Sequence, residues 1–290
     1  ACWPAQRIHD INNQFYLICP RCFNGPETST HTFWECKANE EIDDEAVTST
    51  QSLVPTAILR ASELPCLWLR GLLPESLLDT DAIPAPPDLP NIQVIGNPEA
   101  NWINRIYYGD GSGGQFTSHP CIRRCGVSVV ALDDSNQLLI GLHTNLPGKV
   151  QTVPRAEYYA LQALVCKLLP KSIVEFVTDH QPLFKSFYSA KDVVKKNINY
   201  DILNIIFSTI AEKELTVKVR WMPSHQKTEM VDSLEGVTAI DIIGNDLADK
   251  YAKIAAERCC VDLNSSARIL FYSSLVRRIQ ARLATIITYL

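Results

Sequence analysis

The stretch that decides the fold runs from Ile106 to Gly113 and reads Ile-Tyr-Tyr-Gly-Asp-Gly-Ser-Gly. Its first half is apolar and aromatic, which predicts a strand, and its glycines predict the hairpin turn that ends this strand. Between them stands Asp110, whose neighbours have little side chain, so that a phosphate group could approach its carboxylate. Asp110 is therefore a candidate metal ligand, although Asp-Gly-Ser turns without any such function are common between strands.

The residues after this stretch alternate between strand and helix patterns. We predict strands at 125–132, 138–142, 173–177 and 215–221, and helices at 154–169, 180–188, 199–213 and 242–256. The first three strands follow one another directly, so they are expected to pair antiparallel. Asp179 comes just after a buried strand, at the end where open α/β sheets bind ligands. Glu157 falls in a first helical turn, where a carboxylate could also simply complement the helix dipole.

Composition places the chain among ordinary globular proteins, with 46% hydrophobic and 20% charged residues. The net charge of −5 is uneven, because residues 1–100 carry 5 basic and 14 acidic side chains, whereas residues 101–255 carry 17 and 16. No apolar run is long enough to span a membrane, so we expect no membrane partner. No signal peptide is visible, and a start at Ala1 rather than Met suggests a piece of a longer product.

Four metal-type side chains near the start have the spacing Cys-x2-Cys-x8-His-x4-Cys, and they are Cys19, Cys22, His31 and Cys36. Three thiolates and one imidazole complete a closed tetrahedral site, so the spacing predicts a structural Zn²⁺, with a chance scatter as the alternative. Such a site favours a reducing, intracellular compartment, with nucleus and cytoplasm left open. The stretch also resembles the zinc-binding region that follows the polymerase in many non-LTR reverse transcriptases, in which Glu-Thr-x2-His and an aromatic residue before the last Cys recur.

Residues 101–258 resemble the type 1 ribonuclease H family. The matching pieces occur in the family's order, and they are Asp110-Gly-Ser, Arg155-Ala-Glu157, Thr178-Asp179 with Gln181, Trp221-x-Pro-Ser-His225, and Gly244-Asn245-Asp246-Leu-Ala248-Asp249. The resemblance implies a ribonuclease H-like α/β fold, with a mixed five-stranded sheet whose first three strands are antiparallel and with helices on both faces. A small zinc knuckle would precede it.

The resemblance also implies the site residues. Asp110, Glu157, Asp179 and Asp249 would hold two Mg²⁺ ions, for which Mn²⁺ could substitute, and His225 would assist proton transfer or product release. Asp110 would bridge both ions, Glu157 and Asp179 would hold the ion on the leaving-group side, and Asp249 the ion that activates water. Candidate substrate contacts are Gly111, Ser112, Gln181, Lys195 and Lys196. The two lysines, with Lys191, could equally be a solvated face.

Departures from the family pattern leave the four carboxylates in place. Val153 and Pro154 stand where polar residues are common, His180 replaces a small residue, and Ser224 stands where glycine is frequent. We therefore expect activity, whereas Val153 and Pro154 leave the strictness of the preference for hybrids open.

The chain divides into four expected regions. These are a zinc-knuckle region at 1–45, an acidic, proline-rich linker with short helices at 46–100, the ribonuclease H domain at 101–258 and an amphipathic helix at 259–290. The terminal helix is expected to dock on a neighbouring domain, with a nucleic-acid contact or a dimer seam as alternatives.

The function implied by the resemblance is a metal-dependent endonuclease that cleaves the RNA strand of RNA–DNA hybrids and leaves 5′-phosphates. A zinc region followed by this domain resembles the tail of a non-LTR retrotransposon polyprotein, so an upstream reverse transcriptase is an expected partner. One alternative is an inactive retroelement remnant that only binds nucleic acid, and another is a nuclease or transposase with the same core. Four intact carboxylates favour an enzyme, because an inactive remnant has no reason to keep all of them.

Overall fold

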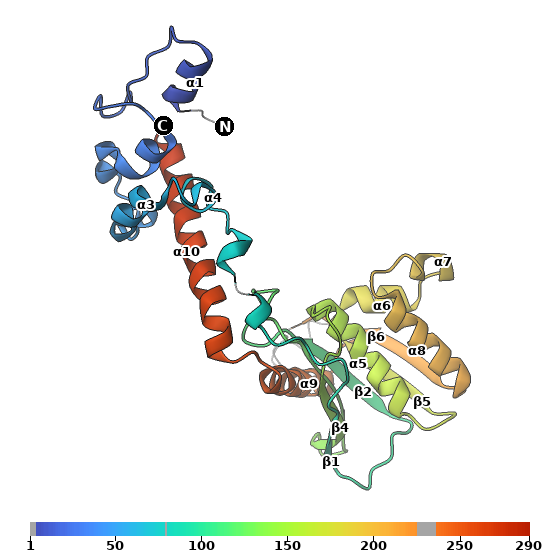
Figure 1. Cartoon of the computed structure of the whole chain (residues 1–290). Helices are drawn as coiled ribbons and strands as arrows, with labels where there is room; N and C mark the ends of the chain where they lie inside the picture. The colour runs from blue at the N-terminus through green and yellow to red at the C-terminus, as the bar shows by residue number, and fades with distance from the viewer. Residues whose placement is uncertain (1–3, 79, 225–235) are drawn as a thin grey trace. The chain divides into compact units, whose positions relative to one another are not determined.

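The computed structural model describes residues 4–78, 80–224 and 236–290 and divides the chain into two compact units (Figure 1). Residues 83–262 form the sheet unit, and residues 1–82 together with 263–290 form the helical unit. Residues 46–82, expected to belong to a linker, are thus part of the helical unit, because their apolar side chains Ala57, Leu67 and Trp68 are buried there.

The sheet unit is built on a mixed sheet with the strand order β1-β4-β3-β2-β5-β6. The strands are β1 (Gln93–Gly96), β2 (Ile106–Ser112), β3 (Gly126–Leu132), β4 (Leu138–Asn145), β5 (Ile173–Thr178) and β6 (Thr216–Trp221). The pairs β1–β4, β4–β3 and β3–β2 are antiparallel. The pairs β2–β5 and β5–β6 are parallel. Since β2 and β5 run in the same direction, their carboxyl ends lie at the same edge of the sheet.

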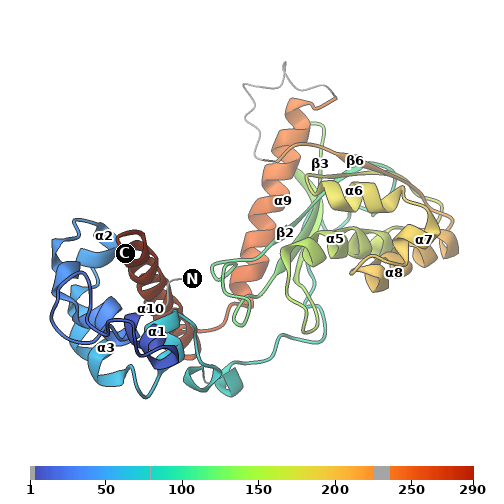
Figure 2. The same cartoon turned by 90° about the horizontal axis from the view of Figure 1, so that it is seen from above.

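Helices cover both faces of this sheet, as Figure 2 shows for α5 and α9. The helices are α5 (Val153–Lys167), α6 (Gln181–Phe187), α7 (Lys191–Val194), α8 (Tyr200–Glu212) and α9 (Ala239–Arg258). Side chains alternate between the faces along each strand. Tyr107 and Val129 accordingly lie in the core with α5 and α8, while Tyr108 and Val130 pack with α9.

The predicted ribonuclease H-like α/β architecture is confirmed, with one strand more than the five expected. The extra strand β1 pairs with β4 at the edge of the sheet. Its residues are mostly exposed, so backbone hydrogen bonds rather than burial of an apolar face define it. A strand of this kind leaves no alternating hydrophobic pattern in the sequence.

A second difference concerns the glycines around Asp110, which were expected to form a hairpin turn. Strand β2 continues to Ser112, so Asp110 and Gly111 lie inside the strand. The reason is close packing, since a Cβ added at Gly111 would lie 2.7 Å from the Cβ of Ala156 in α5. The glycines therefore allow strand and helix to approach each other.

Helix α9 is fixed to the sheet at its first turn. Arg220 of β6 donates hydrogen bonds to both oxygens of Asp241, at 2.6 and 3.2 Å, and the hydroxyl of Tyr108 donates to the same carboxylate at 3.2 Å. Thr238 and Asp241 form a capping box. These contacts tie α9 to β2 and β6 and so set the place of the acidic residues farther along the helix.

The helical unit combines the two ends of the chain. Its helices are α1 (Ala5–Ile11), α2 (Glu45–Thr48), α3 (Val54–Arg60), α4 (Pro65–Arg70) and α10 (Leu263–Thr288), joined by shorter helical turns. Trp34 and Trp68 meet edge to face at 5.7 Å, and Leu275 and Ile279 of α10 pack in the same core. No helix in the described part of the chain is long and apolar enough to cross a membrane.

Arg282 of α10 is the polar centre of this unit, with only 1% of its surface exposed. Its Nε donates to the carbonyl of Phe33 at 3.0 Å, and its Nη1 donates to Val47 O and Thr50 Oγ1 at 3.0 and 3.2 Å. The guanidinium also lies 4.8 Å from the ring centroid of Trp34, a cation–π distance. The side chain therefore connects α10 to residues 33–50.

Replacing Arg282 by Met should destabilise the helical unit by about 2–4 kcal/mol, because Phe33 O, Val47 O and Thr50 Oγ1 each lose a hydrogen bond from a charged donor. Hydrogen exchange on the whole chain would measure this as lost protection in residues 31–70 and in α10, with the sheet unit unchanged. Arg277→Met, at an exposed position of the same helix, is the control. Equal protection in both variants would contradict the assigned role.

Candidate active site

Three carboxylates from three elements converge at one edge of the sheet. Asp110, Glu157 and Asp179 each offer an oxygen, and these oxygens all lie within 4.8 Å of one another. Asp110 stands near the end of β2, and Asp179 directly follows β5. The parallel register pairs Tyr108 with Val177, so the two aspartates, each two residues farther along, come to the same level.

Glu157 completes this cluster from the first turns of α5. Thr152 caps the helix by accepting a hydrogen bond from the backbone N–H of Arg155. The backbone N–H of Gly111 donates to Glu157 Oε1 at 3.1 Å, whereas the buried Glu157 Oε2 has no hydrogen-bond partner in the part of the chain that the structure describes. One oxygen is thus held by the strand, and the other is left for a ligand.

Burial and the charge of a neighbouring carboxylate keep Asp110 and Glu157 from ionising easily. Burial, with the charge of Asp179, raises the pKa of Asp110 to about 6. Burial and the charge of Asp110 likewise raise the pKa of Glu157 well above its usual range. A divalent cation would offset both effects, and carboxylate oxygens are the ligands that hard cations such as Mg²⁺ prefer. The donor set and the unpaired Oε2 therefore fit such an ion.

Asp249 of α9 stands apart from these three. Its charge is near enough to raise the pKa of Asp110, but its Oδ2 accepts a hydrogen bond from Lys253 Nζ at 2.6 Å. The structure therefore brings three of the four predicted carboxylates together and pairs the fourth with a lysine one helical turn away.

The remaining predicted residues lie in varied places. His225 is outside the described residues. Ser112 Oγ accepts a hydrogen bond from the N–H of Gly114, and Gln181 Oε1 accepts one from Lys185. Lys195 and Lys196 are exposed in the turn after α7.

Two contacts near the cluster were not predicted. The indole Nε1 of Trp221 donates to the backbone carbonyl of Asp179 at 3.0 Å and so holds the residue after β5. Lys253 is the other, and its spacing of four from Asp249 on a helix is a signal that the sequence does contain. Asn245, which belongs to the last of the matching motifs, is buried, and its Oδ1 has no partner among the described residues.

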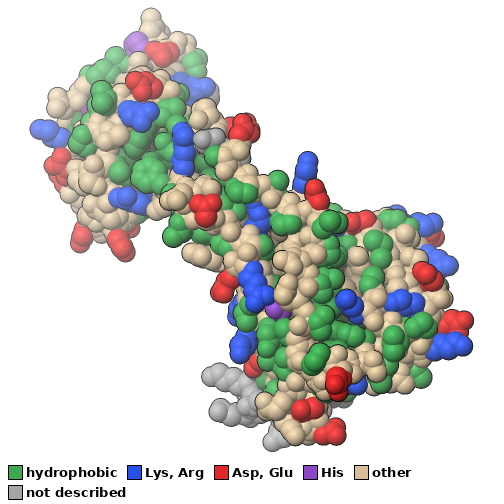
Figure 3. All heavy atoms as spheres, turned by 60° about the horizontal axis from the view of Figure 1, so that its bottom comes forward, with side chains coloured by type: hydrophobic (Ala, Val, Ile, Leu, Met, Phe, Trp, Pro, Cys, Tyr) green, Lys and Arg blue, Asp and Glu red, His purple; other side chains and the backbone are tan. Residues whose placement is uncertain are grey.

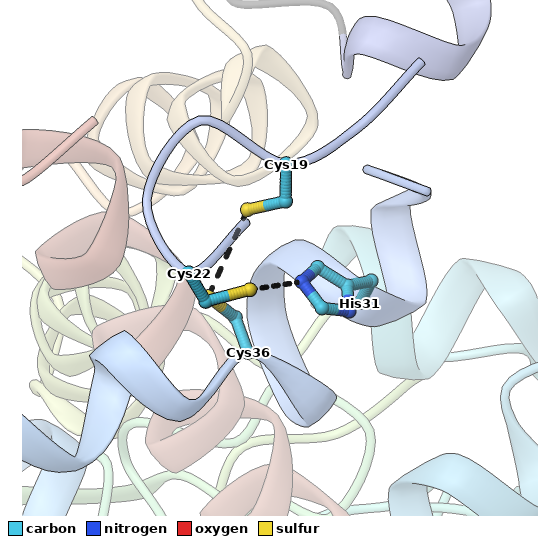
Figure 4. A group of neighbouring side chains, drawn as sticks. All are labelled: Cys19, Cys22, His31 and Cys36. Carbon is cyan, nitrogen blue, oxygen red and sulfur yellow. Dashed lines mark hydrogen bonds between the residues drawn. The ribbon is translucent and has the colours of Figure 1, made fainter. Parts of the chain in front are cut away.

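The second cluster lies in the helical unit, where Cys19, Cys22, His31 and Cys36 offer ligand atoms within 4.8 Å of one another (Figure 4). The sulfurs of Cys19 and Cys36 are 3.9 Å apart. Two sulfurs bound to one tetrahedral zinc would lie about 3.8 Å apart, whereas a disulfide needs about 2.05 Å. Burial raises the pKa of Cys36 to about 12, so a bound cation would be needed to keep it as thiolate. This donor set fits Zn²⁺.

The chain around these ligands forms a knuckle. The N–H of Cys19 donates to Gly25 O at 3.0 Å, and that of Phe23 donates to Cys19 O at 3.0 Å. Gly25 has a φ of +98°, which favours glycine. His31 begins the short helix His31–Glu35, and Cys36 follows it, so one helical turn presents both later ligands.

Among comparisons with known proteins, no family model and no curated protein matches the chain. The solved structures that resemble it include the solution structure of the PFV RNase H domain, with 17% identity, 53% of this chain and 94% of that chain covered, and a TM-score of 0.39. The crystal structure of RNase H1 from the halophilic archaeon Halobacterium salinarum NRC-1 shows 15% identity, covers 53% of this chain and 99% of its own, and has a TM-score of 0.36. Both similarities are low, so the fold is assigned from the strand order and the placement of the helices in the chain itself.

Replacing Asp110 by Asn should stabilise the protein when no divalent cation is present. A carboxyl whose folded pKa of about 6 exceeds the unfolded value of about 3.9 stabilises the fold fully below about pH 4 and loses this contribution as pH rises through 6. At pH 8 the free energy of unfolding, measured with urea, should be about 1–3 kcal/mol higher for the variant than for wild type. Added Mg²⁺ should reduce this difference between the two proteins. Asp134→Asn, in an exposed turn, should change nothing, and equal pH profiles for Asp110→Asn and wild type would contradict the prediction.

Replacing Cys36 by Ser should remove zinc from the protein. Wild type is expected to hold about one zinc per chain by elemental analysis, and the variant should hold much less because one thiolate ligand is lost. Cys66→Ser removes an exposed cysteine outside the cluster and is the control. Purified wild type that is folded but free of zinc would refute the site.

Proposed function

We propose that the chain is a divalent-metal-dependent endonuclease that hydrolyses the RNA strand of RNA–DNA hybrids and leaves 5′-phosphates. The observation that carries the proposal is the cluster of Asp110, Glu157 and Asp179, which places three carboxylates from separate parts of the chain within ligand distance of one another. Among the described residues, Glu157 Oε2 has no hydrogen-bond partner.

The residues of the chain have distinct parts in this chemistry. Two Mg²⁺ ions, or Mn²⁺ in their place, would activate the attacking water and stabilise the leaving oxygen. Asp110, Glu157 and Asp179 would hold the metal, while Gly111 orients Glu157 and Trp221 orients the backbone of Asp179. Asp249 would complete the set from α9. His225 would assist proton transfer.

Contact with the hybrid would involve exposed lysines. Lys and Arg are interspersed with Asp and Glu over the described residues on the face drawn in Figure 3. Lys191, Lys195 and Lys196 are exposed on α7 and the turn after it, and lysines at such a site would contact phosphates. Gly111, Ser112 and Gln181 would lie nearer the scissile bond.

The wider context is part of the same proposal. A zinc knuckle built from Cys19, Cys22, His31 and Cys36 together with this nuclease would belong to a retroelement polyprotein. Its partner would be a reverse transcriptase that makes the hybrid this site cleaves. The geometry of the cysteine and histidine cluster favours this context over an isolated nuclease.

Cleavage of an end-labelled RNA–DNA hybrid in Mg²⁺ tests the function. Wild type should cut the RNA strand and leave duplex DNA and duplex RNA intact. Asp179→Asn should slow cleavage at least about 100-fold, because even residues that only support metal ligands contribute 10–100-fold. Asp134→Asn is the matched control.

Two results would overturn this assignment. Equal cleavage by wild type and Asp179→Asn would place the activity elsewhere or in a contaminant. Tight hybrid binding without any cleavage in Mg²⁺ or Mn²⁺ would favour the nucleic-acid-binding remnant instead.

A further inference from the structure

Lys253 is a basic side chain that the structure pairs with Asp249, a predicted carboxylate of the site. It lies one turn after Asp249 on α9, and its Nζ donates to Asp249 Oδ2 at 2.6 Å. The charges of Asp110 and Asp246 also reach it, and together with the bond to Asp249 they raise the pKa of Lys253. The ammonium group therefore lies in the field of several carboxylates.

Asp110 and Glu157 differ from Asp249 in this respect. Asp110 and Glu157 are buried and have no basic partner among the described residues, so their repulsion is relieved only by protonation or by a bound cation. Asp249 has 33% of its side chain exposed, and Lys253 has 57%. An exposed lysine on a flexible four-carbon stem can turn into solvent at little cost.

We propose that Lys253 is a tethered counter-ion that competes with a divalent cation for Asp249. It occupies the carboxylate when the site is free of metal, and it leaves when an ion is coordinated there, because two cations on one carboxylate repel each other. This inference rests on the metal site of the proposed function. It divides that site into a strong part at Asp110, Glu157 and Asp179 and a weaker part at Asp249.

The consequence is an order of loading. The first ion binds the three converging carboxylates, two of which, Asp110 and Glu157, are buried. The second ion binds only after displacing Lys253, so its affinity is lower, and activity should follow occupancy of this second position.

Titration of the zinc-loaded full chain with Mn²⁺, followed by electron paramagnetic resonance of the free ion, tests the proposal without any turnover. Lys253→Gln should bind the weaker Mn²⁺ about two- to fivefold more tightly than wild type, as expected when an exposed helical ion pair no longer competes. The stronger Mn²⁺ should change less. Lys253→Arg keeps the charge and should bind as wild type does.

Lys250→Gln is the matched control, since it removes the same charge from an exposed position of the same helix, where Lys250 lies 6.0 Å from the ring of Tyr251. It should leave both affinities near the wild-type values. A similar gain in Lys250→Gln and Lys253→Gln would show a general effect of net charge and would overturn the specific role of Lys253.

The remaining outcomes separate this inference from the proposed function. If Lys253→Gln binds Mn²⁺ as wild type does, or more weakly, the pair is only a helix-surface contact and the inference fails, while hybrid cleavage by wild type would still stand. If wild type and Asp179→Asn give the same Mn²⁺ isotherm, the carboxylates hold no metal, and the proposed function fails with it.

Discussion

Electrostatic repulsion between buried carboxylates is the constraint on which the site depends. Asp110 and Glu157 are both buried. Burial raises the pKa of each, together with the charge of Asp179 for Asp110 and the charge of Asp110 for Glu157. A fold gains nothing in stability from such an arrangement, so the surrounding structure has to enforce it. The parallel pairing of β2 with β5 and the close contact of α5 with Gly111 do so by fixing three backbones around one point.

Helix α9 belongs to a different part of this arrangement. Its first turn is fixed by Arg220 and Tyr108 through Asp241, whereas Asp249 lies two turns farther on at the more accessible side. The buried part of the site is thus built into the sheet, and the exposed part is presented by a helix that packs on it. The two parts differ in burial and in their neighbours, and they should therefore differ in how strongly they hold a cation.

Sequence patterns predicted most of the sheet unit because its strands and helices bury regular apolar faces. The helix from Pro154 and the strand from Ile173 were expected from periodicity alone and are present. β1 was missed because it buries almost nothing, and the extent of β2 was misjudged because glycines that allow close packing look like turn glycines. The pairing of Arg282 with residues 33–50 lies beyond such reasoning, since the partners are more than 200 positions apart.

Sequence spacing could predict only those parts of the candidate sites whose residues lie close together in the chain. Spacing alone grouped Cys19, Cys22, His31 and Cys36, which do lie together. The convergence of Asp110, Glu157 and Asp179 came from a family resemblance rather than from spacing, because their distance along the chain carries no geometric information. The contact between Lys253 and Asp249 was visible as a helical spacing of four residues. The charge of Asp110, by contrast, comes near Lys253 only through the folding of β2 against α9.

The helical unit joins residues 1–82 with α10, and the whole sheet unit lies between them in the chain. A ribosome releases the cysteine and histidine ligands early, yet Trp34 and Trp68 meet their α10 partners only after roughly 200 further residues have been made, about 10–40 s at ordinary elongation rates. During that interval the sheet unit can fold on its own, while the amino-terminal segment keeps an incomplete core that a chaperone could recognise. Packing of the core of the helical unit should accordingly finish last, although residues 1–82 of that unit are translated first.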